Sequence, residues 1–218
     1  MDETVSFSLL ELFRMGGVFM WPLLAFSIAT ITIGVERAVY LLYHSLKIDD
    51  LGVKVSELIT SGNYSDAQEY LSPLTKRRMG ARILLALVNR CKPGQGKTFS
   101  EHKAEKIVET EAMVCINSLE NGFNFLVAFG SLSPLTGFLG TVSGMIGAFK
   151  SIAEATEVNA QIVANGIYEA LITTVFGLII AIIAMIFHSV FSHMVDKFAS
   201  GIEKTCSDLI AEIADRQS

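Results

Sequence analysis

The chain has 218 residues, of which 51% are hydrophobic and 18% charged, whereas soluble domains average about 25% charged residues. Its formal net charge is −5 at pH 7 and its mean hydropathy is +0.47. This composition excludes a disordered chain, which needs low hydrophobicity. It also argues against nucleic acid as a partner, because no surplus of basic residues is present to neutralise phosphates.

The first segment, 1–15, favours a short helix that lies on the membrane surface. Acidic Asp2 and Glu3 stand where a cleavable signal peptide carries basic residues, so we do not expect a signal peptide here. The apolar residues of the expected surface helix are Phe7, Leu9, Leu10, Leu12 and Phe13.

Three stretches contain no Asp, Glu, Lys or Arg: Met15–Val35, Asn121–Phe149 and Ala170–Val195. A helix needs roughly 20 apolar residues to cross a bilayer, and lipid offers no hydrogen bonds to any other backbone structure. The alternative, three buried helices of a soluble protein, would leave too little polar surface to cover them. We therefore expect an all-α integral membrane protein with transmembrane helices at 16–43, 121–150 and 166–195.

Basic residues predict the orientation of these helices. Twelve of the 17 lie between Arg37 and Lys106, and three more lie in the C-terminal tail, which leaves Arg14 and Lys150. Because basic residues are retained in the cytoplasm, we expect 44–120 and 196–218 there, the N-terminus outside, and 151–165 as a periplasmic turn.

The cytoplasmic segments read as long helical extensions of the spans. Helices are expected at Asp50–Ser61 and Met79–Val88, and one unbroken helix is expected from Ser100 to Phe149. The last segment, 196–218, continues the third span as an amphipathic helix whose apolar residues include Phe198, Ile202, Leu209 and Ile213.

Nothing in the chain predicts an enzyme, a metal site or a cofactor. Cys91, Cys115 and Cys206 form no CxxC pair and have no metal-ligand spacing, so we interpret them as reduced structural thiols. The sequence also contains no phosphate-binding loop, no HExxH motif and no recognisable nucleophile–base pair.

Small residues recur at steps of three and four along the second and third spans. Such stripes let helices approach closely in lipid, within one chain or between copies. The positions on which we place this packing are Gly137, Gly140, Gly144, Gly147, Gly177 and Ala181.

Few polar residues lie inside the spans, and these are candidates for an ion pathway. At 1.5 Å per residue, Thr141 and Thr174 share a layer roughly 12–14 Å from the outer surface. Thr173 is adjacent to Thr174, and Glu169 lies near the outer mouth of the third span. A threonine in a membrane helix can instead bond only its own backbone. No acidic residue lies at mid-membrane, so a proton path would need Glu169 or an acid from another polypeptide.

Two runs resemble the ExbB/TolQ/MotA proton-channel family. SPLTGFLGTV at Ser133–Val142 resembles the second-span motif, roughly PLLGLLGTV, and GIYEALITTVFGL at Gly166–Leu178 resembles the third-span motif, roughly GIAEALxxTxxGL. The three spans resemble the ExbB/TolQ branch. The chain departs from the family pattern at Asn165 and Ile183, where members usually have Pro.

The resemblance implies a homopentamer around a dimeric ExbD/TolR-like single-span protein that carries a membrane Asp. Thr141 and Thr174 would then line the path opposite that Asp, with Glu169 at its outer entrance. Proton flow would rotate one component against the other and drive a TonB/TolA-like protein, for outer-membrane transport or envelope maintenance. The alternatives are a non-conducting membrane assembly scaffold and a self-sufficient ion channel.

Overall fold

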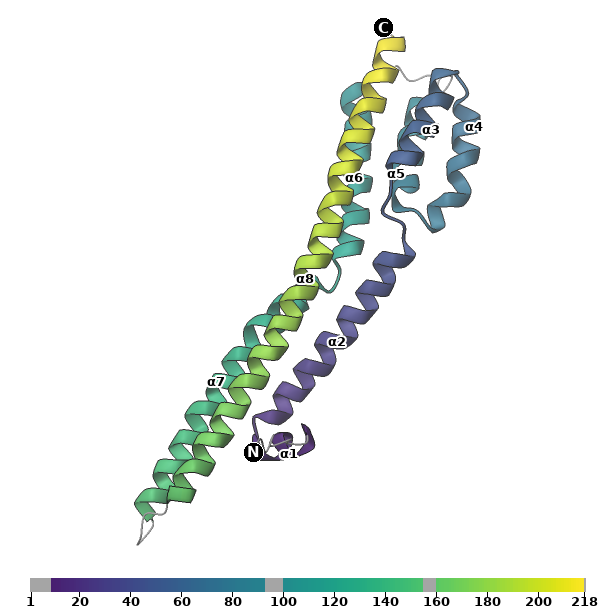
Figure 1. Cartoon of the computed structure of the whole chain (residues 1–218). Coiled ribbons are helices and arrows are strands. Elements are labelled where there is room, and N and C mark those ends of the chain that lie inside the picture. The colour runs from purple at the N-terminus through teal and green to yellow at the C-terminus, as the bar shows by residue number, and fades with distance from the viewer. Residues whose placement is uncertain (1–8, 93–99, 155–159, 218) are drawn as a thin grey trace, which may run out of the picture. The chain divides into compact units, whose positions relative to one another are not determined.

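The computed structural model describes residues 9–92, 100–154 and 160–217, and within these ranges the chain is helical and has no β-strand (Figure 1). The expected all-α class is confirmed. The elements are α1 (Leu9–Met15), α2 (Met20–Tyr43), α3 (Asp49–Thr60), α4 (Tyr64–Leu71), the 3₁₀ helix η1 (Ser72–Lys76), α5 (Met79–Cys91), α6 (Glu101–Glu120), α7 (Phe123–Glu154) and α8 (Ala160–Gln217).

Three helical stretches are long and apolar enough to cross a membrane, as expected. They lie in Met20–Tyr43, Glu101–Glu154 and Gly166–Arg216. The third has the highest mean hydropathy, 2.8, and the first the lowest, 1.4. The placement of the extensions in the cytoplasm and the pentamer stay predictions.

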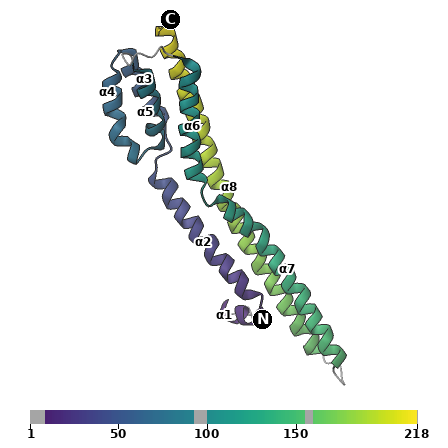
Figure 2. The ribbon, with the colours of Figure 1, turned by 180° about the vertical axis from the view of Figure 1, so that it is seen from behind.

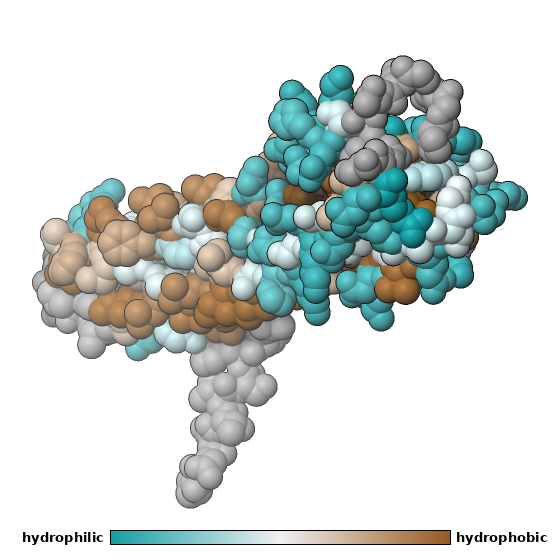
Figure 3. All heavy atoms as spheres, turned by 90° about the horizontal axis from the view of Figure 1, so that it is seen from above, coloured by the Kyte–Doolittle hydropathy of each residue, from teal (hydrophilic) through white to brown (hydrophobic). Residues whose placement is uncertain are grey.

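The chain divides into two compact units, which we call the span unit and the polar unit. The span unit comprises Met1–Val35 and Gly122–Ser189, and the polar unit comprises Glu36–Asn121 and Val190–Ser218. Figure 3 shows hydrophobic residues gathered over the helices of the span unit and hydrophilic residues gathered over those of the polar unit. An apolar outer surface of this kind is suited to lipid or to neighbouring protein and is unfavourable in water.

In the span unit, α7 and the first part of α8 lie side by side (Figure 2). The N-terminal segment packs against α8 through a cluster of Met20, Leu23, Ile172 and Ile180, on which Leu12 and Phe13 of α1 also pack. Phe7 of the expected surface helix lies outside the described residues, as do the side chains of Leu9 and Leu10.

The polar unit has a conventional apolar core. The expected helices at 50–61 and 79–88 are present as α3 and α5, each with minor differences at the ends. The apolar face expected on the last part of α8 is buried in this core. Its fully buried side chains include Leu51 and Val55 of α3, Leu71 of α4, Leu84 and Leu87 of α5, Leu119 of α6 and Ile213 of α8.

Two expected boundaries are wrong. The single helix from Ser100 to Phe149 is interrupted between α6 and α7, where Gly122 has φ +89°. Such a backbone conformation is easily reached only by glycine. The expected turn at 151–165 is shorter, because α7 continues to Glu154 and α8 begins at Ala160; residues 155–159 lie outside the described residues.

α7 gains its last turn from local polar contacts. The Ser151 hydroxyl donates a hydrogen bond to the Gly147 carbonyl at 3.0 Å, and Lys150 lies 3.9 Å from the Glu154 carboxylate, one helical turn away. These contacts favour helix over turn at 150–154. α8 also runs through Asn165 and Ile183 without a break, at the two positions where the resembled family usually has Pro.

Candidate functional site

Glycines bring the backbones of α7 and α8 into close contact in the span unit. A Cβ atom added at Gly137 would lie 2.7 Å from the Thr173 carbonyl oxygen, and one at Gly177 would lie 2.5 Å from the Ser133 carbonyl oxygen. A Cβ at Gly144 would lie 3.0 Å from the Gly166 carbonyl oxygen. Any side chain at these positions would force the two helices apart, so the glycines permit the approach of the polar residues beside them.

The other packing candidates differ in their surroundings. A Cβ at Gly140 would meet the side chain of Thr173 at 2.5 Å, and Ala181 is buried. Gly147 is exposed, and a Cβ there would meet no described atom within 4 Å. The structure thus places Gly147 outside the α7–α8 contact, and the alternative of a contact between copies stays a prediction for this residue.

Three threonine hydroxyls gather around one backbone carbonyl beside these glycines. The hydroxyls of Thr141 and Thr174 both lie 3.3 Å from the Gly137 carbonyl oxygen, and that of Thr173 lies 3.2 Å away. The Thr141 and Thr174 hydroxyls also hydrogen-bond each other across the helix contact. The structure therefore brings together the two threonines that the sequence places in one layer.

The hydroxyl pair Thr141–Thr174 can hold its protons in more than one arrangement. Either hydroxyl can be the donor of the bond that joins them. When Thr174 donates to Thr141, the Thr141 hydroxyl donates to the carbonyl oxygen of Ala170, at 3.2 Å, or of Gly137. When Thr141 donates to Thr174, the Thr174 hydroxyl donates to Gly137. A pair that can reverse its donor is suited to passing a proton or orienting water, although a threonine does not titrate.

Thr173 occupies a different environment from its neighbour. Its side chain is 1% exposed, and its hydroxyl lies 2.8 Å from the Ala170 carbonyl oxygen within its own helix. Thr141 and Thr174 are only half-buried, so they retain an open side. The structure thus places Thr173 in the helix contact, where it packs against Gly140, and leaves the hydroxyl pair accessible from outside the contact.

Glu169 lies next to the turn that precedes α2. Gly17 has φ +65°, and a Cβ atom there would overlap the Glu169 Oε1 atom. Glu169 also lines a hollow of about 430 Å³ together with Ser143, Gly144, Gly147, Ala148, Ser151 and Gly166. The exposed Gly147 therefore widens the hollow that the Glu169 carboxylate lines.

Sequence reasoning missed two features of the span unit. Gly17 contacts the Glu169 carboxylate, and the adjacent pair Gly16–Gly17 is the signal that could have indicated a close approach. Thr30 of α2 is 1% exposed, and its hydroxyl has no hydrogen-bond partner among the described residues; Ser133 of α7 is in the same situation at 0% exposure. The signal that could have indicated Thr30 is a polar residue within the apolar stretch of α2.

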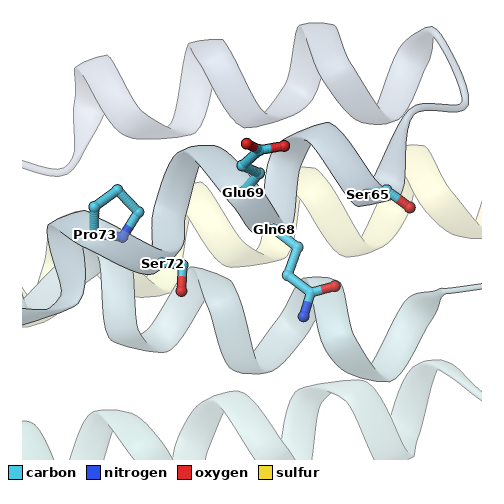
Figure 4. A pocket seen from close by; sticks show the side chains of 5 residues that line it. All are labelled: Ser65, Gln68, Glu69, Ser72 and Pro73. Carbon is cyan, nitrogen blue, oxygen red and sulfur yellow. The ribbon is translucent and has the colours of Figure 1, made fainter.

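No further chemistry emerges elsewhere in the described residues. No group of three His, Cys, Asp or Glu side chains among them could hold a metal ion. A hollow of about 670 Å³ follows the outer side of α4 and η1, but its side chains are all exposed and do not converge on a point (Figure 4). His188 of α8 packs edge-on against Phe123 of α7, with ring centroids 6.1 Å apart.

Comparison with known proteins places these residues in a family. The sequence profile of the MotA/TolQ/ExbB proton channel family matches residues 75–204, more than half of the chain. The biopolymer transport protein ExbB of Salmonella typhimurium is 26% identical over 165 residues, which cover 74% of this chain and 66% of that protein, just under two thirds. The biopolymer transport protein exbB1 of Vibrio cholerae is 28% identical over 204 residues, covering 91% and 85%.

A shorter and more similar match involves the other named branch. The Tol-Pal system protein TolQ of Haemophilus influenzae is 47% identical over 70 residues, which cover 32% of this chain and 31% of that protein. Both branches thus match, as the motif resemblance predicts. With three apolar helices and a profile match over most of its length, this chain is a membrane protein that belongs to the MotA/TolQ/ExbB proton channel family.

Proposed function

We propose that the chain is an ExbB/TolQ-like subunit of a proton-driven motor in the bacterial inner membrane. It works with an ExbD/TolR-like single-span protein and delivers the energy of the ion gradient to a TonB/TolA-like protein. The work done is outer-membrane transport or envelope maintenance. The printed names of the relatives, a biopolymer transport protein and a Tol-Pal system protein, support this class of work.

The observation that carries the proposal is the half-buried hydroxyl pair Thr141–Thr174 at the contact of two membrane helices. The pair can reverse the direction of its hydrogen bond, and the stretch from Ala170 to Val195 supplies no carboxylate beside it. A proton path needs a titratable group. A membrane Asp on the single-span partner would supply that group opposite the pair, and Glu169 would stand at the outer entrance.

Basic residues support the orientation of the chain. With 15 of 17 Lys and Arg residues in 37–106 and 197–216, the positive-inside rule favours a cytoplasmic polar unit and a periplasmic N-terminus. A homopentamer is proposed because the resemblance to the ExbB/TolQ branch implies one. The exposed apolar side chains of the span unit, such as Phe138 at 62% and Ile146 at 64%, supply surface for contacts between copies.

Co-purification tests the assembly. The full chain would be co-expressed with a candidate single-span protein that carries a membrane Asp, purified in mild detergent and weighed by native mass spectrometry. We expect several copies of this chain around fewer partner chains, and we expect the Asp→Asn partner to assemble equally well without conducting protons. A homo-oligomer that binds none of the candidate partners would contradict the proposal.

A non-conducting scaffold is the second candidate, favoured by the packing of glycines against backbone atoms. The two functions respond differently to matched substitutions. Gly140→Leu would separate α7 from α8 in both cases, because an added Cβ would lie 2.5 Å from the Thr173 hydroxyl oxygen. Thr141→Val keeps the shape of the side chain but removes the hydroxyl, so it would abolish work by a motor and leave a scaffold intact.

A further inference from the structure

The exposed side chain of Arg77 lies against the end of α2, the first candidate span. The backbone N–H of Ser45 donates a hydrogen bond to the Arg77 carbonyl oxygen at 3.1 Å. The Arg77 guanidinium carbon lies 5.6 Å from the centroid of the Tyr43 ring, and Tyr43 is the last residue of α2. These contacts fix the connection between η1 and α5 at the point where the apolar helix ends.

The positive charge of this region is only partly paired with carboxylates of the described residues. Arg78 lies 2.5 Å from the Asp50 carboxylate, but Lys47, Lys76 and Arg77 have no carboxylate within 4.0 Å among the described residues. All three side chains are exposed. The first turn of α5, which follows directly, contributes no acidic residue. We call Lys47, Lys76 and Arg77 the basic cluster.

We propose that the basic cluster binds the headgroups of anionic phospholipids in the bilayer that the chain spans. Tyrosine at the end of an apolar helix lies at headgroup level, and Tyr43 is 59% exposed. Arg77 contacts the Tyr43 ring and the backbone of Ser45, and Lys76 and Lys47 lie close to these residues in the sequence, so we place the basic cluster at the same level. Arg and Lys donate charge-assisted hydrogen bonds to phosphate oxygens, and basic segments beside a span are attracted to anionic lipid surfaces.

This site is independent of ion conduction, because none of its residues belongs to the threonine layer. Its role is to anchor the end of the first span at the surface of the membrane. Two features distinguish the basic cluster from a solvated charged surface. The ring of Tyr43 lies against the Arg77 guanidinium, and the hydrogen bond from Ser45 N–H to the Arg77 carbonyl oxygen holds the segment between η1 and α5 near the end of α2.

Lipid titration of the purified full chain tests the proposal. Short-chain phosphatidylglycerol would be added to the protein in mild detergent at low salt, and binding would be followed by the rise in Tm and by native mass spectrometry. The double variant Lys76→Gln, Arg77→Gln should bind roughly 10- to 30-fold more weakly. The matched control is Lys103→Gln, Lys106→Gln, which removes the same charge from exposed positions of α6 and should bind normally.

Two further probes identify the ligand. Phosphatidylcholine, which has no net charge, and glycerophosphate, which has the charge but no acyl chains, should each bind at least tenfold more weakly than phosphatidylglycerol. Equal binding of phosphatidylcholine, equal binding of glycerophosphate, or an equal loss in the α6 control would overturn the proposal. If the double variant does not fold, Lys76→Gln alone, whose side chain makes no ion pair among the described residues, should still weaken binding about fivefold; unchanged binding would count against the site.

Discussion

Gly177→Ala tests directly whether the contact between α7 and α8 holds the span unit together. The added Cβ would lie 2.5 Å from the Ser133 carbonyl oxygen, 3.2 Å from the Ser133 carbonyl carbon and 3.3 Å from Gly137 Cα, whereas ordinary contact begins at 3.4 Å. All three atoms belong to the backbone, so no side chain can rotate away and the helices must separate.

The size of the effect follows from two opposing contributions. Overpacking a well-packed contact costs about 1–3 kcal/mol, and replacing glycine by alanine within a helix returns up to about 1 kcal/mol. We therefore expect Gly177→Ala to lower the free energy of unfolding by about 1–2 kcal/mol. Because Thr174 lies one turn away, the same separation should lengthen its hydrogen bond to Thr141.

The assay is unfolding of the purified protein in mixed micelles, followed by circular dichroism as the denaturing detergent is increased. Gly147→Ala is the matched control, since a Cβ there meets no described atom within 4 Å. It should be no less stable than the unsubstituted protein, and more stable by up to about 1 kcal/mol, because only the gain in helix propensity applies there. Equal losses in both variants, or no loss in Gly177→Ala, would refute the packing argument.

Two more predictions follow from other parts of the chain. Gly17→Ala should displace the N-terminal segment, because Gly17 has φ +65° and an added Cβ would overlap Glu169. The fluorescence emission of Trp21, the single tryptophan, should therefore change. It should not change in the control Gly62→Ala, where φ is +77° and an added Cβ meets no described atom within 4 Å. Burial raises the pKa of the Cys91 thiol to about 11, so maleimide should label this thiol slowly in the folded protein at pH 8. The unfolded chain loses the thiol proton near pH 9 and the folded protein near pH 11, so the free energy of unfolding should fall between these pH values. Rapid labelling at pH 8 without unfolding would contradict the burial of Cys91.

The elements that the sequence predicted well are those that a single physical property controls. The absence of charge over 20 or more residues is enough to locate the spans, because lipid permits little else. The shared layer of Thr141 and Thr174 followed from the fixed rise of a helix, and the structure places their hydroxyls in contact.

The elements that the sequence missed depend on single residues in context. The sequence does not predict the break at Gly122, because one glycine inside a helical pattern is often tolerated. In the structure, Asn121 with ψ 128° and Gly122 with φ +89° together leave the helical conformation. The contact between Gly17 and Glu169 joins residues far apart in the chain, which no local pattern reports. Thr173 and Thr174 differ in burial because of the side of α8 that meets α7. Their positions in the sequence do not tell which of the two threonines lies in that contact.

Proton flux through the reconstituted complex shows whether the hydroxyl pair Thr141–Thr174 belongs to the proton path. The complex of this chain with its Asp-bearing partner would be reconstituted in liposomes, and acidification would be recorded with a pH-sensitive dye under an imposed potential. We expect at least tenfold less flux for the double variant Thr141→Val, Thr174→Val, with assembly unchanged. Thr136→Val, whose hydroxyl donates only to the Leu132 carbonyl of its own helix at 2.9 Å, should conduct normally. Full flux through the double variant would contradict the assignment of this hydroxyl pair to the proton path.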